Sequence, residues 1–150
     1  KGFYTWTPPT FNDNCSAFFT NQPSSNFGFF NIGNTTINYT ASDPSGNITT
    51  CSFIITVVDS TPPIINVQNV APQSNDPGQC GANVIINSPS IQPDCSLPIS
   101  LVNDQNGTDD ATGFYPVATT TITWTATDAV GNVSTATQDI TVIDTQLPDI

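Results

Sequence analysis

The stretch GFFNIGNTTINYTASDPSGNITTCSFIITVVD (residues 28–59) recurs as GFYPVATTTITWTATDAVGNVSTATQDITVID (residues 113–144). The two copies are in constant register, since Trp124 follows Tyr39 by 85 positions. Two earlier segments, residues 6–15 and 86–95, match at a spacing of 80 positions. Repeats of this length with no helical period predict a tandem array of small domains rather than one enzyme domain.

Both copies alternate apolar and polar residues with a period of two, which is typical of a half-buried β-strand. In the second copy, Ile122, Trp124 and Ala126 share one face of the first strand. The returning strand departs from the pattern at one point, where Gln138 replaces the Phe53 of the first copy. The sequence offers no explanation for that exchange.

The two strands of each copy are joined by the same short motif, Asp-x-x-Gly-Asn, at residues 43–47 and 128–132. Gly46 and Gly131 suit the left-handed position that follows a type I turn in a bulged hairpin. The motif therefore predicts a tight β-hairpin in each repeat.

Short strands with frequent turn signals predict an all-β chain of tandem immunoglobulin-like sandwiches, of which the first is incomplete. We expect residues 1–59 to be the C-terminal part of a first repeat, 60–144 a complete repeat and 145–150 the start of a third. Strands of the complete repeat are expected near residues 64–69, 82–88, 97–103, 113–117, 119–127 and 133–143. Residues 1–59 have no counterpart of residues 60–80, which predicts a window on a longer chain. The alternative is a filament subunit that borrows a strand from its neighbour.

The charge inventory excludes several functions. The net charge is −11 with a single cation, Lys1, and all 12 acidic residues are Asp. Such a chain suits neither nucleic acid nor an anionic membrane surface. The absence of His and Glu removes the usual general bases and zinc ligands, so we expect no enzyme and no required cofactor. No segment is apolar and long enough to span a bilayer.

Four cysteines and several glycosylation sequons favour an extracellular or cell-surface location. The candidate N-glycosylation sites are Asn34, Asn38, Asn47, Asn106 and Asn132, with a further sequon at Asn14.

Several motifs together resemble the hyalin repeat (HYR) family. They are DSTPPII (59–65), PGQCGANV (77–84), WTPPTFNDNC (6–15), GFYPVATTT (113–121) and YTASDPSGNITTCSF (39–53). The resemblance covers essentially the whole chain. It implies an immunoglobulin-like sandwich used in tandem in extracellular matrix and adhesion proteins, including gliding-motility adhesins of bacteria. No catalytic residue comes with it.

The complete repeat contains two cysteines, Cys80 and Cys95, which we expect to pair. A bridge that closes ~15 residues would contribute roughly 3 kcal/mol on the chain-entropy model. The alternative is two free thiols.

The resemblance also implies a second bridge, between a cysteine just after the Pro-Pro motif and one after the hairpin. In the complete repeat both cysteines are replaced, by Val67 and Ala136. Register then favours partners upstream of Lys1 for both Cys15 and Cys51. A Cys15–Cys51 bridge is the alternative.

Asp43 and Asp128 begin the two hairpins, where an Asp side chain commonly caps its own turn. A second interpretation is calcium binding. In an immunoglobulin-like sandwich the last hairpin and the loop after the second strand lie where the chain enters, which would bring Asp128 and Asp94 near Asp59. Three carboxylates with nearby carbonyls could hold Ca²⁺ between repeats.

These features predict a structural spacer of a long surface fibre or adhesin. Its expected partners are adjacent repeats of the same chain, with lateral self-association into a filament as a further hypothesis. The alternative function is a module that itself binds surface polysaccharide or protein. An exposed aromatic patch would favour that alternative, and its candidates are Phe18, Phe19, Phe27, Phe29 and Phe30, unless they form the core.

Overall fold

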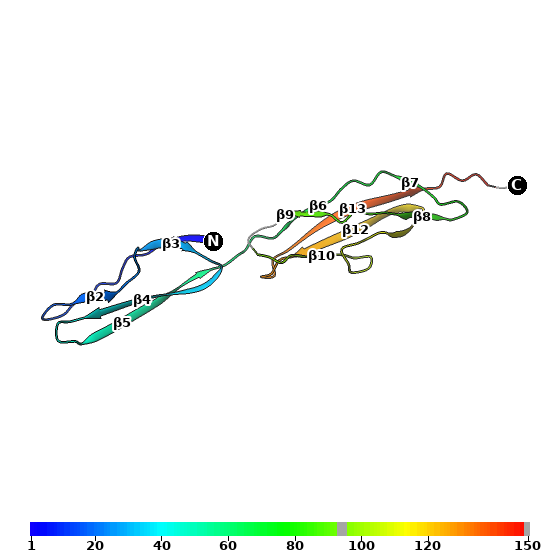
Figure 1. Cartoon of the computed structure of the whole chain (residues 1–150). Coiled ribbons are helices and arrows are strands. Elements are labelled where there is room, and N and C mark those ends of the chain that lie inside the picture. Colours follow the sequence, from blue (N-terminus) through cyan, green and yellow to red (C-terminus); the bar gives the residue numbers. More distant parts are fainter. Residues whose placement is uncertain (93–95, 149–150) are drawn as a thin grey trace. The chain divides into compact units, whose positions relative to one another are not determined.

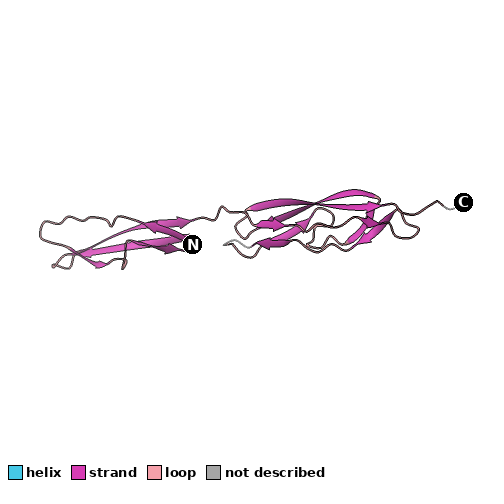
Figure 2. Ribbon diagram, turned by 90° about the horizontal axis from the view of Figure 1, so that it is seen from above, coloured by secondary structure: helices cyan, strands magenta, loops and turns pink. Residues whose placement is uncertain are grey.

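The computed structural model describes residues 1–92 and 96–148, and the chain divides into two compact units, Lys1–Asp59 and Ser60–Ile150. The described residues form strands and loops without any helix (Figure 2). No helix that could cross a membrane is therefore found among them. The predicted all-β class of tandem immunoglobulin-like sandwiches is confirmed.

Unit 1 is built from two antiparallel sheets (Figure 1). One sheet pairs β1 with β3, and the other has the order β2-β4-β5. The strands are β1 (Gly2–Thr5), β2 (Phe18–Asn21), β3 (Phe27–Phe30), β4 (Gly33–Ser42) and β5 (Ile48–Val57).

Unit 2 contains the same elements and three more. Its main sheet has the order β10-β12-β13-β7, and the pairs β11-β8 and β6-β9 complete it. The strands are β6 (Ile64–Asn66), β7 (Gln73–Ser74), β8 (Gly81–Val84), β9 (Ser90–Gln92), β10 (Ser100–Asn103), β11 (Gly113–Pro116), β12 (Ala118–Thr127) and β13 (Val133–Ile143). Strands β7 and β9 were not predicted, because β7 has only two residues and β9 lies in a Pro- and Ser-rich stretch whose composition indicates turns.

The longest pairing in each unit is the predicted hairpin. Strands β4 and β5 pair from Gly33↔Val57 to Ser42↔Ile48, and β12 and β13 pair from Ala118↔Val142 to Thr127↔Val133. The turn glycines have the expected left-handed backbone, with φ of 89° at Gly46 and 95° at Gly131. A residue with a Cβ would be strained at either position.

The strand registers reproduce the two spacings of the sequence. Gly28 pairs with Tyr4 in unit 1, and Gly113 pairs with Val84 in unit 2. One partner is shifted by 85 positions and the other by 80. Equivalent residues of the two repeats therefore occupy equivalent places in the two sheets.

The two cores differ in size. The core of unit 2 is one cluster of buried side chains from β8, β11, β12, β13 and the loops beside them: Ala82, Val84, Ile86, Ala111, Tyr115, Ile122, Trp124, Ile140 and Val142. The buried core of unit 1 is Ile37, Tyr39 and Ile55, with aromatic side chains packed around it. Residues 1–59 contain no strand in the places of β6 and β7, so less of this core is covered.

The exchange of Phe53 for Gln138 follows from the aromatic residue at the centre of each core. In unit 2 the buried Gln138 accepts a hydrogen bond from Trp124 Nε1 (2.9 Å) and donates one to the carbonyl of Gln68 (2.7 Å). A buried indole N–H needs such an acceptor.

In unit 1 the arrangement is reversed. Tyr39 takes the place of Trp124, and its hydroxyl accepts a hydrogen bond from Trp6 Nε1 (2.7 Å). Phe53, in the place of Gln138, packs edge-on against Trp6 with the ring centroids 6.0 Å apart. Trp6 itself stands where unit 2 has Ile86. The residues at these three positions therefore change together: unit 1 has Trp6, Tyr39 and Phe53, and unit 2 has Ile86, Trp124 and Gln138.

We expect Gln138→Leu to destabilise unit 2 by about 1–3 kcal/mol, because it leaves the buried Trp124 N–H and the Gln68 carbonyl without partners. Denaturant unfolding in a Trp6→Phe background, in which Trp124 is the only tryptophan, measures this loss. Thr137→Ala, an exposed neighbour on β13, is the control and should unfold like the parent. Equal stability of the Gln138→Leu variant would contradict the role assigned to this side chain.

Candidate functional site

The Asp128 carboxylate is bound within its own hairpin, as the capping interpretation predicts. Its Oδ1 accepts hydrogen bonds from the backbone N–H groups of Val130 (3.0 Å) and Asn132 (2.8 Å). Its Oδ2 accepts one from the side-chain amide of Asn132 (2.8 Å). Burial opposes ionisation of Asp128, but the hydrogen bonds from Asn132, Val130 and Gly131 outweigh it and hold the pKa of this carboxyl below its usual range.

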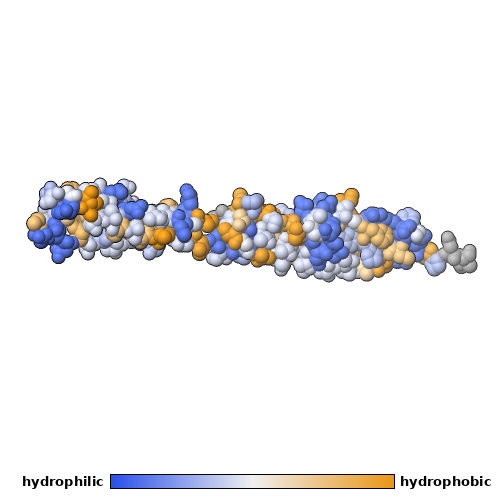
Figure 3. Space-filling view, turned by 90° about the horizontal axis from the view of Figure 1, so that it is seen from below, coloured by the Kyte–Doolittle hydropathy of each residue, from blue (hydrophilic) through white to orange (hydrophobic). Residues whose placement is uncertain are grey.

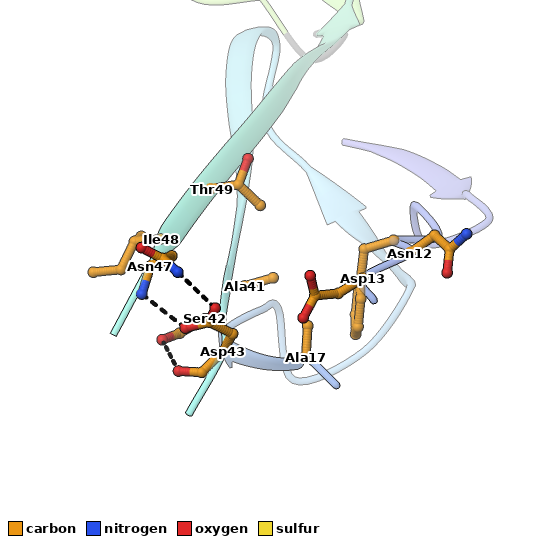
Figure 4. A pocket seen from close by; sticks show the side chains of 10 residues that line it. Asn12, Asp13, Ala17, Ala41, Ser42, Asp43, Asn47, Ile48 and Thr49 are labelled. Atoms are coloured by element: carbon orange, nitrogen blue, oxygen red, sulfur yellow. Dashed lines mark hydrogen bonds between the residues drawn. The ribbon is translucent and has the colours of Figure 1, made fainter. Parts of the chain in front are cut away.

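The first hairpin is closed in the same way. Asp43 Oδ1 accepts the backbone N–H of Asn47 (2.8 Å), and Oδ2 accepts its side-chain amide (2.7 Å), as Figure 4 shows. The side-chain and backbone hydrogen bonds from Asn47 lower the pKa of Asp43. Both Asp residues therefore have a local structural role that needs no ligand.

The predicted calcium ligands are not gathered within one described unit. Asp59 ends unit 1, Asp128 lies in unit 2, and Asp94 lies outside the described residues. Among the described residues, no group of three or more His, Cys, Asp or Glu side chains could hold a metal ion. Calcium binding at Asp59, Asp94 and Asp128 stays a prediction.

The described cysteines Cys15, Cys51 and Cys80 are exposed and do not bridge one another. Cys95 lies outside the described residues, so its pairing with Cys80 stays a prediction. Partners upstream of Lys1 for Cys15 and Cys51 likewise stay a prediction.

The aromatic residues of unit 1 divide between the core and the surface. Phe19 and Phe30 are partly buried against the core, as the core interpretation predicts. Phe18, Phe27 and Phe29 are exposed, with Phe29 the most exposed of them at 73%. The sequence could not separate the two groups, because the residues follow one another closely and the short strands β2 and β3 begin among them.

Phe27 and Phe29 join Phe3 on the outer face of the β1–β3 sheet, and we call these three residues the aromatic face. Phe3 pairs directly with Phe29, and the ring of Phe3 lies 5.1 Å from that of Phe29 and 6.3 Å from that of Phe27. Phe3 was not among the predicted patch residues, because its place in the patch depends on this strand pairing. On the side of the molecule drawn in Figure 3, apolar residues lie in separate groups among hydrophilic ones.

Exposure of this face is a property of the repeat and not only of unit 1. The equivalent positions of unit 2 are Asn83, Thr112 and Phe114, and all three are exposed there as well. The face is therefore open even where β6 and β7 are present. Unit 1 differs by having a phenylalanine at each position.

The predicted glycosylation sites fall into two groups. The side-chain nitrogens of Asn47, Asn106 and Asn132 donate hydrogen bonds inside their own turns. For Asn34 and Asn38, both exposed on β4, the described residues accept no hydrogen bond from the side-chain nitrogen. Modification stays a prediction at all five, and the last two would accept a sugar with the least disturbance.

A buried polar side chain, which no sequence motif indicated, organises the loop between β10 and β11. Asn103 is 3% exposed, and its Nδ2 donates to the carbonyls of Thr108 (2.7 Å) and Asp110 (3.2 Å). Its Oδ1 accepts the N–H groups of Gln105 and Asn106. These bonds fix the loop between β10 and β11 and leave no free group for chemistry.

Comparison with known proteins identifies the same repeat twice. The profile of the HYR domain family matches residues 3–57 and 58–142. The chain is 35% identical to hyalin of Strongylocentrotus purpuratus over 146 residues, and 32% identical to hyalin of Lytechinus variegatus over 147 residues. These alignments cover 93% and 95% of the chain but only 12% and 26% of the two hyalins.

A rat protein named sushi, von Willebrand factor type A, EGF and pentraxin domain-containing protein 1 is 31% identical over 145 residues, which are 85% of the chain and 4% of that protein. Among solved structures, the extracellular cadherin domains 1–5 of protocadherin gamma B2 align over 91% of the chain and 32% of that structure, with a TM-score of 0.38 and 13% identity. The sequence relatives confirm the predicted extracellular or cell-surface location.

We expect the hairpin of unit 2 to loosen as Asp128 is protonated. Because its pKa is lowered in the folded state, its contribution is present above about pH 4 and is lost as the pH falls through the folded-state value. Amide hydrogen exchange at Val130 and Asn132 should be faster in Asp128→Asn than in the parent at neutral pH. That difference should shrink below pH 4. Asp139→Asn is the control, and a constant difference across this range would contradict the prediction.

The Cys80–Cys95 bridge can be tested by peptide mapping without reduction. We expect one linked peptide pair containing these two residues, and Cys80→Ser should lower the stability of unit 2 by roughly 3 kcal/mol. A Cys51–Cys80 or Cys15–Cys95 peptide would overturn the register argument. Thr119→Ser, on the exposed part of β12, is the matched control for an unrelated change to serine.

Proposed function

Because the chain belongs to the HYR domain family, we propose that it is a structural spacer of a long extracellular or cell-surface fibre or adhesin. The family consists of non-enzymatic, adhesion-type repeats. In this proposal the repeats extend a distal binding region away from the surface and catalyse no reaction. Adjacent repeats of the same chain are their main partners, and lateral association into a filament is a second hypothesis.

One observation carries the proposal: each of two consecutive HYR matches coincides with a unit that has its own strands and its own hydrophobic core. Units of this kind can be added in series without redesign of their neighbours, which is how repeat proteins gain length. The side chains of Asp43 and Asp128 in the turns, Asn103 in a loop and Gln138 in the core are all hydrogen-bonded within their own unit, which supports a structural role.

The surface charge suits such a role. Unit 2 carries nine of the 12 Asp residues. Unit 1 carries the other three Asp residues and Lys1. Repulsion between acidic modules disfavours collapse of the chain on itself and keeps it soluble. The effect is screened by salt, with a Debye length of about 8 Å at physiological ionic strength.

A second candidate function, a binding module, is favoured by the aromatic face of unit 1. Exposed rings with polar neighbours such as Thr5 are suited to the apolar faces of sugar rings or to aromatic and aliphatic side chains. Unit 1 has three Asp residues and Lys1, against nine Asp residues in unit 2, so unit 1 is also less repulsive toward an acidic partner. The two functions differ in whether these repeats touch the ligand.

A replacement experiment separates the two functions. If the repeats are spacers, we expect the full-length protein to keep its adhesion when the repeats in residues 1–144 are replaced by an equal number of unrelated immunoglobulin-like repeats. Loss of adhesion would favour the binding module. That module also predicts that Phe3→Ser, Phe27→Ser and Phe29→Ser together abolish binding while the unit stays folded. Ile48→Ser and Ile54→Ser, on the exposed surface of β5, are the matched control.

Calcium is kept as a separate proposal, because the spacer needs no cofactor. If Asp59, Asp94 and Asp128 bind Ca²⁺, calorimetry should show saturable binding that Asp59→Asn weakens at least tenfold, or about 1.4 kcal/mol. Asp139→Asn should have no effect. Small-angle scattering with and without EDTA should then show a change in the maximum dimension of the chain. Unchanged scattering and no heat of binding would contradict the proposal that these residues bind Ca²⁺.

A further inference from the structure

The phenylalanines of the aromatic face are not required by the fold of the repeat. In unit 2 the position of Phe3 is taken by Asn83, and the position of Phe27 is taken by Thr112. The third position carries Phe114, which is 54% exposed although β6 and β7 are present in that unit. Since the same strands form with polar residues at two of the three positions, the rings of unit 1 point to a contact outside the unit.

The three rings lie beside one another and leave much of their surface open. The ring centroids of Phe3 and Phe29 are 5.1 Å apart, and those of Phe3 and Phe27 are 6.3 Å apart. The ring planes are tilted by 56° and 45°, so neither pair is stacked face to face. These separations are close to the length of one hexopyranose unit in an extended polysaccharide. Neighbouring sugar units of such a chain therefore match neighbouring phenyl rings.

The exposed area of the aromatic face is too small for a stable protein interface. Phe3, Phe27 and Phe29 are 57%, 54% and 73% exposed. With about 150–250 Å² for a whole aromatic side chain, the three offer roughly 300–450 Å² together. A stable protein contact takes about 800 Å² from each partner. The area therefore favours a ligand of a few sugar rings over a second copy of the chain.

The charges of the chain disfavour an ionic ligand at this face. Strands β1 and β3 contain no charged side chain, and the acidic residues of unit 1 are Asp13, Asp43 and Asp59. A cationic ligand would find no carboxylate on these two strands. An anionic polymer would be repelled by the net charge of −11. The aromatic face therefore suits an uncharged ligand.

One polar side chain stands at the edge of the aromatic face. Thr5 lies two residues after Phe3, on the same side of β1, and pairs with Phe27. It is exposed, and the described residues offer its hydroxyl no hydrogen-bond partner. This hydroxyl is therefore available to a sugar hydroxyl beside the rings.

We propose that the aromatic face binds an uncharged polysaccharide of β-linked glucose-type units. Such rings keep their hydroxyls at the rim and line both faces with C–H bonds, and the β-linked chain is an extended ribbon. The partial positive charge of the C–H bonds is attracted to the electron-rich face of a phenyl ring. This inference rests on the binding-module function, to which it adds the class of ligand, and not on the spacer role.

An NMR titration of the isotope-labelled chain with cellohexaose, a β-linked glucose oligomer, tests the proposal. We expect saturable shifts of the amide signals of Phe3, Thr5, Phe27 and Phe29, with a Kd below about 1 mM. Maltohexaose, whose α-linked chain coils, should bind at least tenfold more weakly. An anionic galacturonate hexamer should do the same, because the chain repels it.

Variants that borrow residues from the other repeat locate the site. Phe3→Asn combined with Phe27→Thr introduces the residues that unit 2 carries at these positions, and the affinity for cellohexaose should fall at least tenfold. Phe18→Asn combined with Ile48→Thr makes the same two kinds of change at exposed positions of β2 and β5 and should leave the affinity unchanged. Circular dichroism establishes that both variants are folded.

Four results would overturn the proposal. They are the absence of saturable binding up to about 1 mM cellohexaose, unchanged affinity in the Phe3→Asn and Phe27→Thr variant, equal binding of maltohexaose, and a dimer mass that this variant lacks. The last result would assign the aromatic face to a second copy of the chain.

The replacement of the repeats in residues 1–144 tests the binding-module function separately. Loss of adhesion on that replacement, together with no binding of cellohexaose, would keep the binding module and overturn only its assignment to a polysaccharide. Binding of cellohexaose with adhesion retained would support the sugar site and show that adhesion does not depend on it.

Discussion

The antiparallel pairing of the last two strands in each repeat is the contact on which the rest of the unit depends. Ten consecutive residue pairs join β4 to β5 and β12 to β13, far more than join any other strands of the two units. One face of this ribbon carries the central core residues, and its turn is closed by an Asp that binds the backbone of its own hairpin. Because side chains alternate along a strand, a slip of one residue would turn the whole core face toward solvent. By setting the register of the two strands, the turn therefore determines which side chains face the core.

Much of this arrangement could be read from the sequence, because the signals are local. The two spacings, the alternation around Trp124 and the Asp-x-x-Gly-Asn turns are properties of neighbouring residues, and the structure bears them out. What could not be read depends on contacts between distant segments. The parallel pairing of β7 with β13 joins Gln73 to Val142, and no pattern in a two-residue strand announces it.

The same limit applies to the candidate sites. The sequence placed Asp43 and Asp128 in their turns, but it could not say which of the clustered phenylalanines reach the surface. Phe29 is exposed because it faces away from the core on β3, whereas Phe30, the next residue, packs against Trp6. That division is set by the pairing of β3 with β1, whose residues lie more than 20 positions away. The predicted calcium ligands come from both units, Asp59 from unit 1 and Asp128 from unit 2. Local sequence patterns do not determine how residues of separate units are placed.

The two solutions for the core centre have a consequence for how such repeats can evolve. Tandem repeats exchange sequence by recombination. A crossover between Trp6 or Ile86 and the last hairpin of the repeat would separate that residue from the aromatic residue of the hairpin, Tyr39 or Trp124. A hybrid of Trp6 with Trp124 would put two indole side chains at core positions where each unit has one indole and one smaller side chain. The reciprocal hybrid, Ile86 with Tyr39, would leave a phenol hydroxyl facing an aliphatic side chain. Both hybrids carry a defect that neither parent has, so we expect the segments that carry these core positions to be exchanged together.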